Sequence, residues 1–278
     1  MSDCNACQSK DGCQKDKEQC MIENNPMSNI KNVIGVMSGK GGVGKSTISV
    51  MIAKQLTQFG FKVGILDADI TGPSIPRLLG LADVKASGTE EFIYPVETED
   101  GIKVMSLNFL VDDESDPVIW RGPVIGNMVK QFWTDVLWED LDYLLIDMPP
   151  GTGDVALTAM QSIPIDGLVM VSVPQDMVSM IVAKAVNMAK KMDISILGVI
   201  ENMSYITCPD CGKKIDLFDG ENTKEFLKEN DLYLLGELPM KSSVSKLSST
   251  GYKSNSAELW DMFNPTVMNI LKRLEEVK

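Results

Sequence analysis

A glycine- and lysine-rich run near residue 40 has the residue types that bind phosphate. Residues 39–47 read Gly-Lys-Gly-Gly-Val-Gly-Lys-Ser-Thr, a full match to GxxxxGK[ST]. Glycines let the backbone turn its N–H groups toward a phosphate, Lys45 has the reach for the β- and γ-phosphates, and Ser46 offers a hydroxyl to Mg²⁺. The expected ATP-binding residues of this loop are Gly39, Lys40, Gly41, Gly42, Val43, Gly44, Lys45, Ser46 and Thr47.

The same glycines also spell GxGxxG, the fingerprint of dinucleotide-binding folds. In such a protein Asp67, at the end of the second apolar run, would bind a ribose. Two features favour a triphosphate instead. The Lys45-Ser46-Thr47 run has no role in a dinucleotide site, and another apolar run ends in Asp147, as a magnesium-binding aspartate would. The sequence therefore predicts ATP with Mg²⁺ rather than NAD.

Three carboxylates are expected to gather at one edge of the sheet. Asp67 and Asp69 follow the second apolar run, and Asp147 follows a later one. Open α/β sheets bind ligands at the carboxyl ends of their strands, so these groups should face the phosphates. Capping of the next helix is the alternative for Asp67 and Asp69. Residues 147–154, Asp-Met-Pro-Pro-Gly-Thr-Gly-Asp, are interpreted as a switch that senses the γ-phosphate.

Cysteines are the remaining reactive residues, and none lies in an expected helix or strand. Cys208 and Cys211 form a CxxC pair, a spacing shared by zinc knuckles, redox dithiols and iron–sulfur ligands. Histidine is absent, so two thiolates need further ligands from the N-terminal tail or from a second copy of the chain. A two-fold dimer would supply four cysteines, which suits a 4Fe-4S cluster or zinc equally by count. The tail cysteines are Cys4, Cys7, Cys13 and Cys20.

Alternating apolar and helical stretches would position these residues. They predict a doubly wound, mostly parallel α/β sheet with helices on both faces, the fold of a P-loop NTPase. A polar segment without periodicity, residues 1–29, is predicted to be a flexible tail and linker before one ATPase domain, residues 30–278. The expected strands are 33–37, 62–67, 143–147, 168–173, 196–200 and 233–238, with a helix at 45–59, a hairpin with arms 92–96 and 102–106 between the second and third strands, and a last helix at 256–276 that packs on the sheet.

The length, composition and net charge of the chain limit which classes of partner are expected. The chain has 278 residues, 44% of them hydrophobic, which suits one core of roughly 250 residues plus a tail. Its formal net charge of -13 repels phosphate backbones and anionic membranes, so neither nucleic acid nor membrane is an expected partner. No signal pattern opens the chain and no apolar run approaches the roughly 20 residues that span a bilayer, so we expect a cytoplasmic protein.

The phosphate loop resembles that of the deviant Walker A ATPases, which share KGGxGK[ST] and include MinD, ParA and the nitrogenase iron protein. This resemblance implies that Lys40 crosses a nucleotide-sandwich dimer to the partner's phosphates. It also implies that Asp69 orients the attacking water, that Asp67 supports magnesium and that Asn202 reads the adenine edge. Pro239 is expected on a loop that flanks the base.

Two further segments carry a closer resemblance. Residues 201–205 (Glu-Asn-Met-Ser-Tyr) lead into Cys208-Pro-Asp-Cys211-Gly, and residues 67–74 read Asp-Ala-Asp-Ile-Thr-Gly-Pro-Ser. Together they resemble the Mrp/ApbC family of iron–sulfur carrier ATPases over about residues 30–275. The family implies a homodimer with a labile 4Fe-4S cluster on Cys208 and Cys211 of each subunit, received from a cluster donor and passed to apoproteins under control of ATP hydrolysis.

The tail also resembles part of that family. Some relatives carry an N-terminal cluster on a CxxC-x5-C core, which Cys4, Cys7 and Cys13 match. Their fourth cysteine lies upstream, whereas Cys20 lies downstream, so the identity of the fourth ligand stays open. The tail is expected to hold a cluster, and the alternatives are that it holds zinc or only delivers metal. For the whole chain, two other functions share the loop: a spatial-positioning ATPase resembling MinD or ParA, and an ATP-driven electron donor resembling the nitrogenase iron protein.

Overall fold

The computed structural model describes residues 21–278 except residues 71, 112–121, 178–179, 218–220 and 242–256. Its strands are β1 Asn29–Ile30, β2 Val33–Ser38, β3 Val63–Asp67, β4 Ser87–Gly88, β5 Ile93–Tyr94, β6 Val96–Glu97, β7 Lys103–Met105, β8 Asp140–Leu141, β9 Tyr143–Asp147, β10 Gly167–Ser172, β11 Ile196–Thr207, β12 Lys214–Asp216 and β13 Leu234–Pro239. Its helices are α1 Lys45–Gln58, α2 Ile75–Leu79, η3 Leu107–Phe109, α3 Gly122–Thr134, α4 Asp154–Ser162, α5 Pro174–Met177, α6 Met180–Lys191, α7 Glu221–Glu229 and α9 Ala257–Val277.

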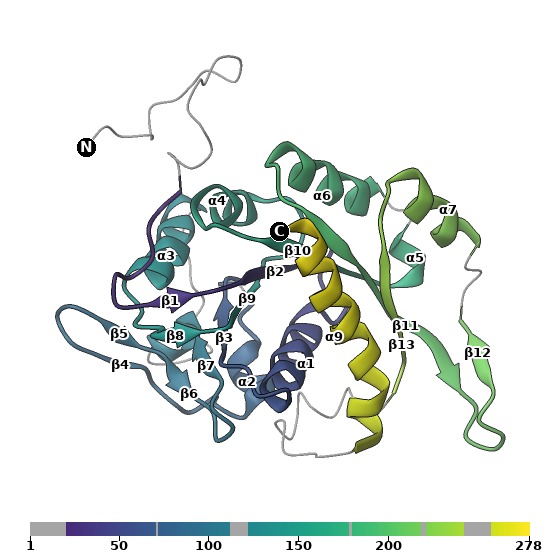
Figure 1. The fold of residues 1–278 in the computed structure, drawn as a ribbon, viewed down its shortest axis with the longest axis horizontal. Helices are drawn as coiled ribbons and strands as arrows, with labels where there is room; N and C mark the ends of the chain where they lie inside the picture. The colour runs from purple at the N-terminus through teal and green to yellow at the C-terminus, as the bar shows by residue number, and fades with distance from the viewer. Residues whose placement is uncertain (1–20, 71, 112–121, 178–179, 218–220, 242–256) are drawn as a thin grey trace.

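A central sheet, nine-stranded within the described residues, organises these elements (Figure 1). The strand order is β12-β11-β10-β2-β9-β3-β7-β6, and β13 also pairs with β11. All pairs are parallel except β11 with β12 and β6 with β7. The predicted doubly wound, mostly parallel α/β sheet is confirmed, and its parallel order brings the carboxyl ends of β2, β3 and β9 to one edge.

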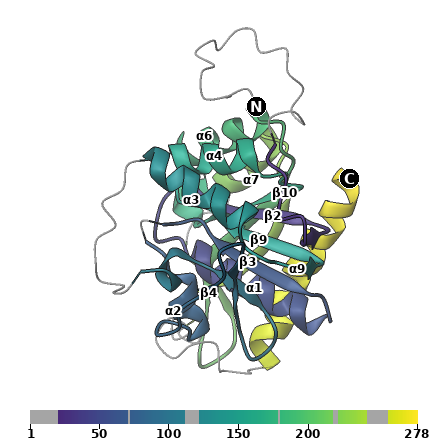
Figure 2. The same ribbon diagram turned by 90° about the vertical axis from the view of Figure 1, so that its left-hand side faces the viewer.

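Both faces of the sheet are covered, which explains why its central strands are apolar throughout. Successive side chains of a strand point to opposite faces. On β2, Val33 and Met37 pack with α3, α4 and α6, while Ile34 and Val36 pack with α1 and α9. Figure 2 shows these two helical layers on either side of the sheet. Buried strands of this kind hold their ends in fixed positions, as a site at the sheet edge requires.

The linker expected before Ile30 is packed against the domain from Ile22 onward. The backbone N–H of Ile22 donates to Ser162 O at 2.9 Å, and Trp133 Nε1 donates to Ile22 O at 2.8 Å. Asn25 is buried, and β1 pairs with β8. The polar composition of the segment did not predict these contacts, because backbone hydrogen bonds and two separate apolar side chains, Ile22 and Ile30, attach it without a periodic apolar stripe. Residues 1–20 lie outside the described residues.

Two strand predictions differ from the structure. The expected hairpin is short, because β6 pairs antiparallel with β7 over two residue pairs only, and β7 itself joins the main sheet parallel to β3. The strand expected at 196–200 continues to Thr207 as β11. The apolar run stops at Ile200, but backbone pairing with β13 and β12 carries the strand seven residues further, from 201 to 207.

The last helix packs as expected. Phe263, Val267, Ile270 and Leu274 of α9 are buried against the layer that contains α1. This burial leaves the apolar stripe of α9 on the protein core rather than free for a membrane surface. Among the described residues no helix combines the length and the hydropathy needed to cross a bilayer.

Candidate functional site

The phosphate-binding loop connects β2 to the start of α1. Gly42 and Gly44 have φ values of 82° and 86°, which only glycine adopts freely, so the loop turns twice around Val43. The loop borders a cavity of about 310 Å³ that Asp69 and Pro150 also line. Of the predicted ATP-binding residues, Gly41, Gly42, Gly44, Lys45, Ser46 and Thr47 line this cavity, whereas Gly39, Lys40 and Val43 do not.

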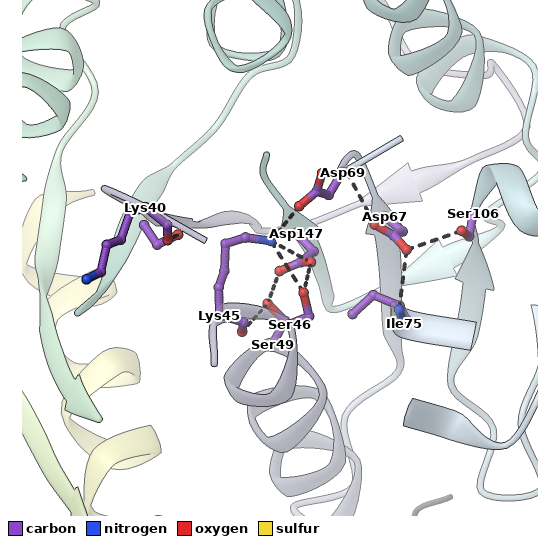
Figure 3. Close-up of polar contacts among 10 residues, drawn as sticks. Lys40, Lys45, Ser46, Ser49, Asp67, Asp69, Ile75, Ser106 and Asp147 are labelled. Atoms are coloured by element: carbon purple, nitrogen blue, oxygen red, sulfur yellow. Dashed lines mark hydrogen bonds and ion pairs between the residues drawn. The ribbon is translucent and has the colours of Figure 1, made fainter. Parts of the chain in front are cut away.

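Asp147 is the centre of the polar contacts beneath the loop (Figure 3). Its Oδ2 accepts from Lys45 Nζ at 2.7 Å and from Ser46 Oγ at 2.6 Å, and its Oδ1 accepts from Ser49 Oγ at 2.7 Å. Asp147 is fully buried and Lys45 is 6% exposed, so the ion pair is shielded from water. The sequence predicted Lys45, Ser46 and Asp147 as neighbours, and the structure brings them together.

Ser49 is a site residue that the sequence analysis missed. Its hydroxyl is buried one helical turn after Lys45, a spacing that places both side chains on the same face of α1. Because Asp147 ends a different element, nothing in the local sequence indicates the contact. Ser49 therefore fixes the orientation of the carboxylate that Lys45 and Ser46 share.

Replacing Ser49 with alanine is expected to lower nucleotide hydrolysis by about 10- to 100-fold, the usual loss when a group that orients a ligand-binding residue is removed. The measurement is steady-state phosphate release at saturating ATP. Thr57→Ala is the matched control, since Thr57 Oγ1 in the same helix bonds only to the helical carbonyl of Ala53 at 3.0 Å among its described contacts. Equal rates for Ser49→Ala and the control would refute the assigned role.

Asp67 lies in the protein interior, where its carboxylate is held by hydrogen bonds. It is fully buried and accepts from Asp69 N at 3.2 Å, Ile75 N at 3.4 Å and Ser106 Oγ at 3.2 Å. Burial, reinforced by the charge of Asp147, raises the pKa of Asp67 to about 8. Ser106 comes from the end of β7, a second contact that the sequence did not reveal. The magnesium-supporting role of Asp67 stays a prediction.

Asp69 faces the phosphate loop directly. Its Oδ2 lies 3.8 Å from Lys45 Nζ, and it lines the cavity. The two carboxylates therefore have different partners. Asp67 accepts hydrogen bonds from backbone N–H groups and from Ser106, whereas Asp69 faces the ammonium of Lys45. The arrangement places a carboxylate where an attacking water could be oriented, a role that for Asp69 remains predicted.

Lys40 points away from this cluster. Figure 3 shows its side chain extending from the loop on the side opposite Asp67, and the residue is exposed. Lys45 lines the cavity and Lys40 does not. The direction is compatible with a contact across a dimer, which stays a prediction.

The segment 147–154 lies beside the end of β2 and the cavity, and its role as a switch stays a prediction. Gly151 N donates to Ser38 O at 2.8 Å, and Pro150 lines the cavity.

Asn202 is close to the phosphate-binding loop, because its Nδ2 donates to Val43 O at 2.9 Å. Pro239 is the last, buried residue of β13 rather than part of a loop, and β13 pairing with β11 is what extends the strand that far. Neither Asn202 nor Pro239 lines the cavity, so adenine contact is untested for both.

Cys208 and Cys211 lie at the tip of a β-hairpin. The arms are the end of β11 and β12, paired from Tyr205–Asp216 to Thr207–Lys214. The turn is closed by Cys208 N to Lys213 O and Gly212 N to Cys208 O, both 2.9 Å. Figure 1 shows this hairpin extending beyond the body of the sheet. Cys211 is exposed and Cys208 half-buried, so both thiols are within reach of a second molecule.

The turn favours a thiolate. The backbone N–H of Cys211, then that of Asp210, and the Cys211 side chain lower the pKa of Cys208 by hydrogen bonding. Across the described residues no three histidine, cysteine, aspartate or glutamate side chains form a group that could hold a metal ion. The described part of one chain therefore offers a soft metal two thiolates only. Cys4, Cys7, Cys13 and Cys20 lie outside the described residues.

Known proteins are similar in sequence to most of this chain, including the region of the phosphate-binding loop. A family model described as "ParA: NUBPL iron-transfer P-loop NTPase" matches residues 29–274. A Clostridium perfringens protein named iron-sulfur cluster carrier protein is 50% identical over 266 residues, covering 90% of this chain and 93% of that protein.

Solved structures of other proteins have a similar fold. A nucleotide-binding protein from Archaeoglobus fulgidus in complex with ADP is 42% identical, with a TM-score of 0.72 over 84% of this chain and 92% of its own. The Pyrococcus furiosus cell division ATPase MinD is 21% identical, with a TM-score of 0.61 over 87% of this chain and 98% of its own, and shows the fold alone. These matches confirm the resemblance drawn from the motifs. The chain belongs to the ParA group of P-loop NTPases, in its NUBPL iron-transfer family.

Proposed function

We propose that this protein is an ATP-dependent carrier that holds a 4Fe-4S cluster between two copies of the chain and passes it to apoproteins. The observation that carries the proposal is the accessible Cys208–Cys211 pair, half-buried and exposed respectively, on a hairpin that extends from a P-loop NTPase core. Two thiolates per chain fall short of the four that such a cluster takes, and a two-fold axis supplies the other two. A relative's name, iron-sulfur cluster carrier protein, supports the cargo.

The nucleotide site supports hydrolysis of ATP. Its loop, Lys45 and the carboxylates Asp69 and Asp147 provide backbone N–H donors, a cation and a group that orients water. Ser46 and Asp147 offer the hard oxygen ligands that Mg²⁺ prefers, and would hold it. The ion, when bound, would neutralise negative charge on the phosphates. We propose that hydrolysis changes the geometry of the dimer and so gates release of the cluster.

The proposal keeps the expected partners. They are a second copy of the chain, a cluster donor and recipient apoproteins, and the cytoplasm stays the predicted location. The acidic net charge of -13 continues to disfavour nucleic acid as a partner. A tail cluster on Cys4, Cys7, Cys13 and Cys20 is a separate prediction.

Anaerobic reconstitution tests the carrier function. Protein purified without oxygen and treated with iron and sulfide should gain a broad absorbance near ~400 nm and about four iron and four sulfide per dimer at the hairpin pair. Incubation with the apo form of a 4Fe-4S enzyme should then restore that enzyme's activity while the absorbance is lost from this protein. Zinc without sulfide after anaerobic purification would contradict the proposal.

Replacing Lys40 with alanine tests the cross-subunit contact. We expect ATP turnover to fall by roughly 10³-fold, as when a cation supplied in trans to a phosphoryl group is removed, while nucleotide affinity of the separate chains changes far less. Turnover and nucleotide affinity are measured side by side. Lys54→Ala is the control, because Lys54 pairs with Asp100 at the surface and lies outside the loop. Unchanged turnover in Lys40→Ala would refute the contact.

A further inference from the structure

The strand that carries the cysteine hairpin also touches the phosphate-binding loop. Asn202 of β11 is 5% exposed, and its Nδ2 donates to Val43 O at 2.9 Å. Its Oδ1 accepts from Met203 N at 3.0 Å. A Cβ at position 44 would overlap Asn202 Nδ2 and approach the Met203 methyl group, so this close approach requires Gly44. One amide side chain therefore bonds to the loop and to its own strand.

Strand β11 is irregular at the same point. It pairs with β10 as far as Glu201 and with β12 only from Tyr205. On β13, Glu237 pairs with Glu201 and Pro239 pairs with Tyr205. From the first pair to the second, β11 advances four residues (201 to 205) while β13 advances only two (237 to 239). Met203, between them, has φ 54°, in the left-handed region that methionine rarely adopts. Residues 202–204 thus form a bulge between the core part of β11 and the hairpin.

Beyond the bulge, the hairpin is attached mainly to the end of β13. Met240 N donates to Tyr205 O at 2.8 Å, and Ser204 Oγ donates to Leu238 O at 3.2 Å. Lys214 of β12 pairs with Glu237 at 2.6 Å and lies 4.6 Å above the Tyr205 ring. These contacts join β12, the end of β11 and the end of β13 into one arm. Asn202 links this arm's bulge to the loop through its hydrogen bond to Val43 O.

The Val43–Gly44 peptide unit contains both the carbonyl that Asn202 binds and an N–H group of the phosphate-binding loop. Its C=O is the acceptor of Asn202, and its N–H belongs to the loop that cradles phosphate. A peptide unit is planar, so any rotation of the N–H turns the C=O with it. The unit turns about ψ of Val43 and φ of Gly44, and Gly44, at φ 86°, has no Cβ to restrict its side of that rotation. Phosphate at the loop and the donor of Asn202 therefore act on one rigid group.

We infer that Asn202 and Met203 are positioning residues that couple the phosphate state of the loop to the position of the Cys208–Cys211 hairpin. When the loop rotates the Val43 carbonyl, Asn202 moves with its acceptor, the bulge at Met203 absorbs the change in backbone angle, and the arm shifts as a unit. The inference rests on the proposed function for its purpose, because the moving thiols are those assigned to the cluster. It needs no cluster for its test.

The test measures how fast iodoacetamide alkylates Cys208 and Cys211 in cluster-free full-length protein, kept reduced, with and without a saturating non-hydrolysable ATP analogue. Peptide mass spectrometry separates these thiols from those of the tail. We expect the analogue to change the wild-type rate roughly 5-fold or more. Asn202→Asp keeps the acceptor for Met203 N but loses the donor to Val43 O, and should bring the ratio of the two rates close to unity.

A second variant and a control make the result decisive. Met203→Gly accepts the positive φ but frees the bulge, so it should also lose the nucleotide effect although the hydrogen bond from Asn202 to Val43 O is kept. Asn269→Asp is the matched control, since Asn269 Nδ2 donates to Leu235 O at 2.9 Å, far from the loop, and should keep the wild-type ratio. Fluorescent-nucleotide titration sets the saturating concentration for each protein, and Met203→Gly decides the matter if Asn202→Asp binds too weakly.

Two results would overturn the inference. One is a wild-type ratio of unity. The other is a nucleotide effect that both variants retain, as would happen if the analogue protected the thiols only by pairing two copies of the chain. Failure of the carrier proposal is a different result, namely no cluster bound or transferred, and leaves the measured coupling in place.

Discussion

Lys45→Ala is expected to lower ATP turnover by roughly three orders of magnitude or more, to the background of the assay. Lys45 Nζ lies 2.7 Å from Asp147 Oδ2 and 3.8 Å from Asp69 Oδ2, at the floor of the cavity that the loop encloses. Its removal withdraws the buried cation that the loop directs to the β- and γ-phosphates, and leaves two carboxylates facing them. Negative charge would then repel the nucleotide instead of binding it.

The same substitution is expected to destabilise the fold. Asp147 is fully buried, and a buried carboxylate that loses its cation costs about 3–5 kcal/mol. Lys45 also opposes the rise in the pKa of Asp67, so its loss favours the protonated form of that second carboxyl group. Urea unfolding and phosphate release, measured on the same preparation, separate lost catalysis from lost fold. Lys45→Ala that stays folded and hydrolyses ATP at the wild-type rate would exclude this lysine from the reaction.

Lys45→Arg refines the result. Arginine keeps the charge beside Asp147 but replaces a compact ammonium with a planar fork. The variant should therefore recover most of the stability lost in Lys45→Ala without recovering turnover. Recovery of both would mean that charge alone, and not the geometry of the ammonium, matters at this position.

The phosphate-binding loop and the strand ends beside it were predictable, because local patterns indicate each of them. Glycine spacing indicated the loop, an apolar run ending in Asp147 indicated the neighbouring strand, and the parallel sheet then required Lys45 and Asp147 to meet. The α/β fold followed from the same runs, whose central strands are buried on both faces.

Contacts between distant segments were not predictable from those patterns. Ser106 reaches Asp67 only because β7 joins the sheet beside β3, whereas the sequence had indicated a hairpin inserted between the second and third strands. Asn202 was expected at an adenine edge by resemblance, which stays a prediction, and its bond to the Val43 carbonyl was not expected. Ile22 attaches the N-terminal segment through hydrogen bonds of its backbone and through its side chain, which packs on the core, and one isolated apolar residue is a weak sequence signal. Each case depends on tertiary pairing that one sequence does not specify.

Cys208→Ala is expected to remove nearly all iron and sulfide from the hairpin pair, and Cys211→Ala to do the same. In a two-fold dimer each substitution is present in both copies, so it removes two of the four ligands at once. A cluster left with two thiolates is open to water on one side and lost. The measurement is iron and acid-labile sulfide per dimer after anaerobic reconstitution, with the absorbance spectrum recorded alongside.

Tail cysteines provide the control. Cys4, Cys7, Cys13 and Cys20 are present in wild type and in both variants, so the difference in iron between the proteins reports the hairpin alone. Cys20→Ala should keep the hairpin's share of iron. ATP turnover at the loop should survive in Cys208→Ala, since the thiols lie at the end of an arm outside the cavity. A variant with normal iron would show that the cluster is held elsewhere.

Mixed dimers give the sharpest form of this prediction. If the cluster bridges two copies, a dimer of one wild-type chain and one Cys208→Ala/Cys211→Ala chain offers two thiolates, no more than a single wild-type chain does. Equal mixing of the two tagged chains should then leave the mixed dimers without hairpin iron, although each contains one intact Cys208–Cys211 pair. A cluster held within one chain would instead give mixed dimers half the iron of wild type. Because the described residues place no third ligand near the pair, we expect the first result.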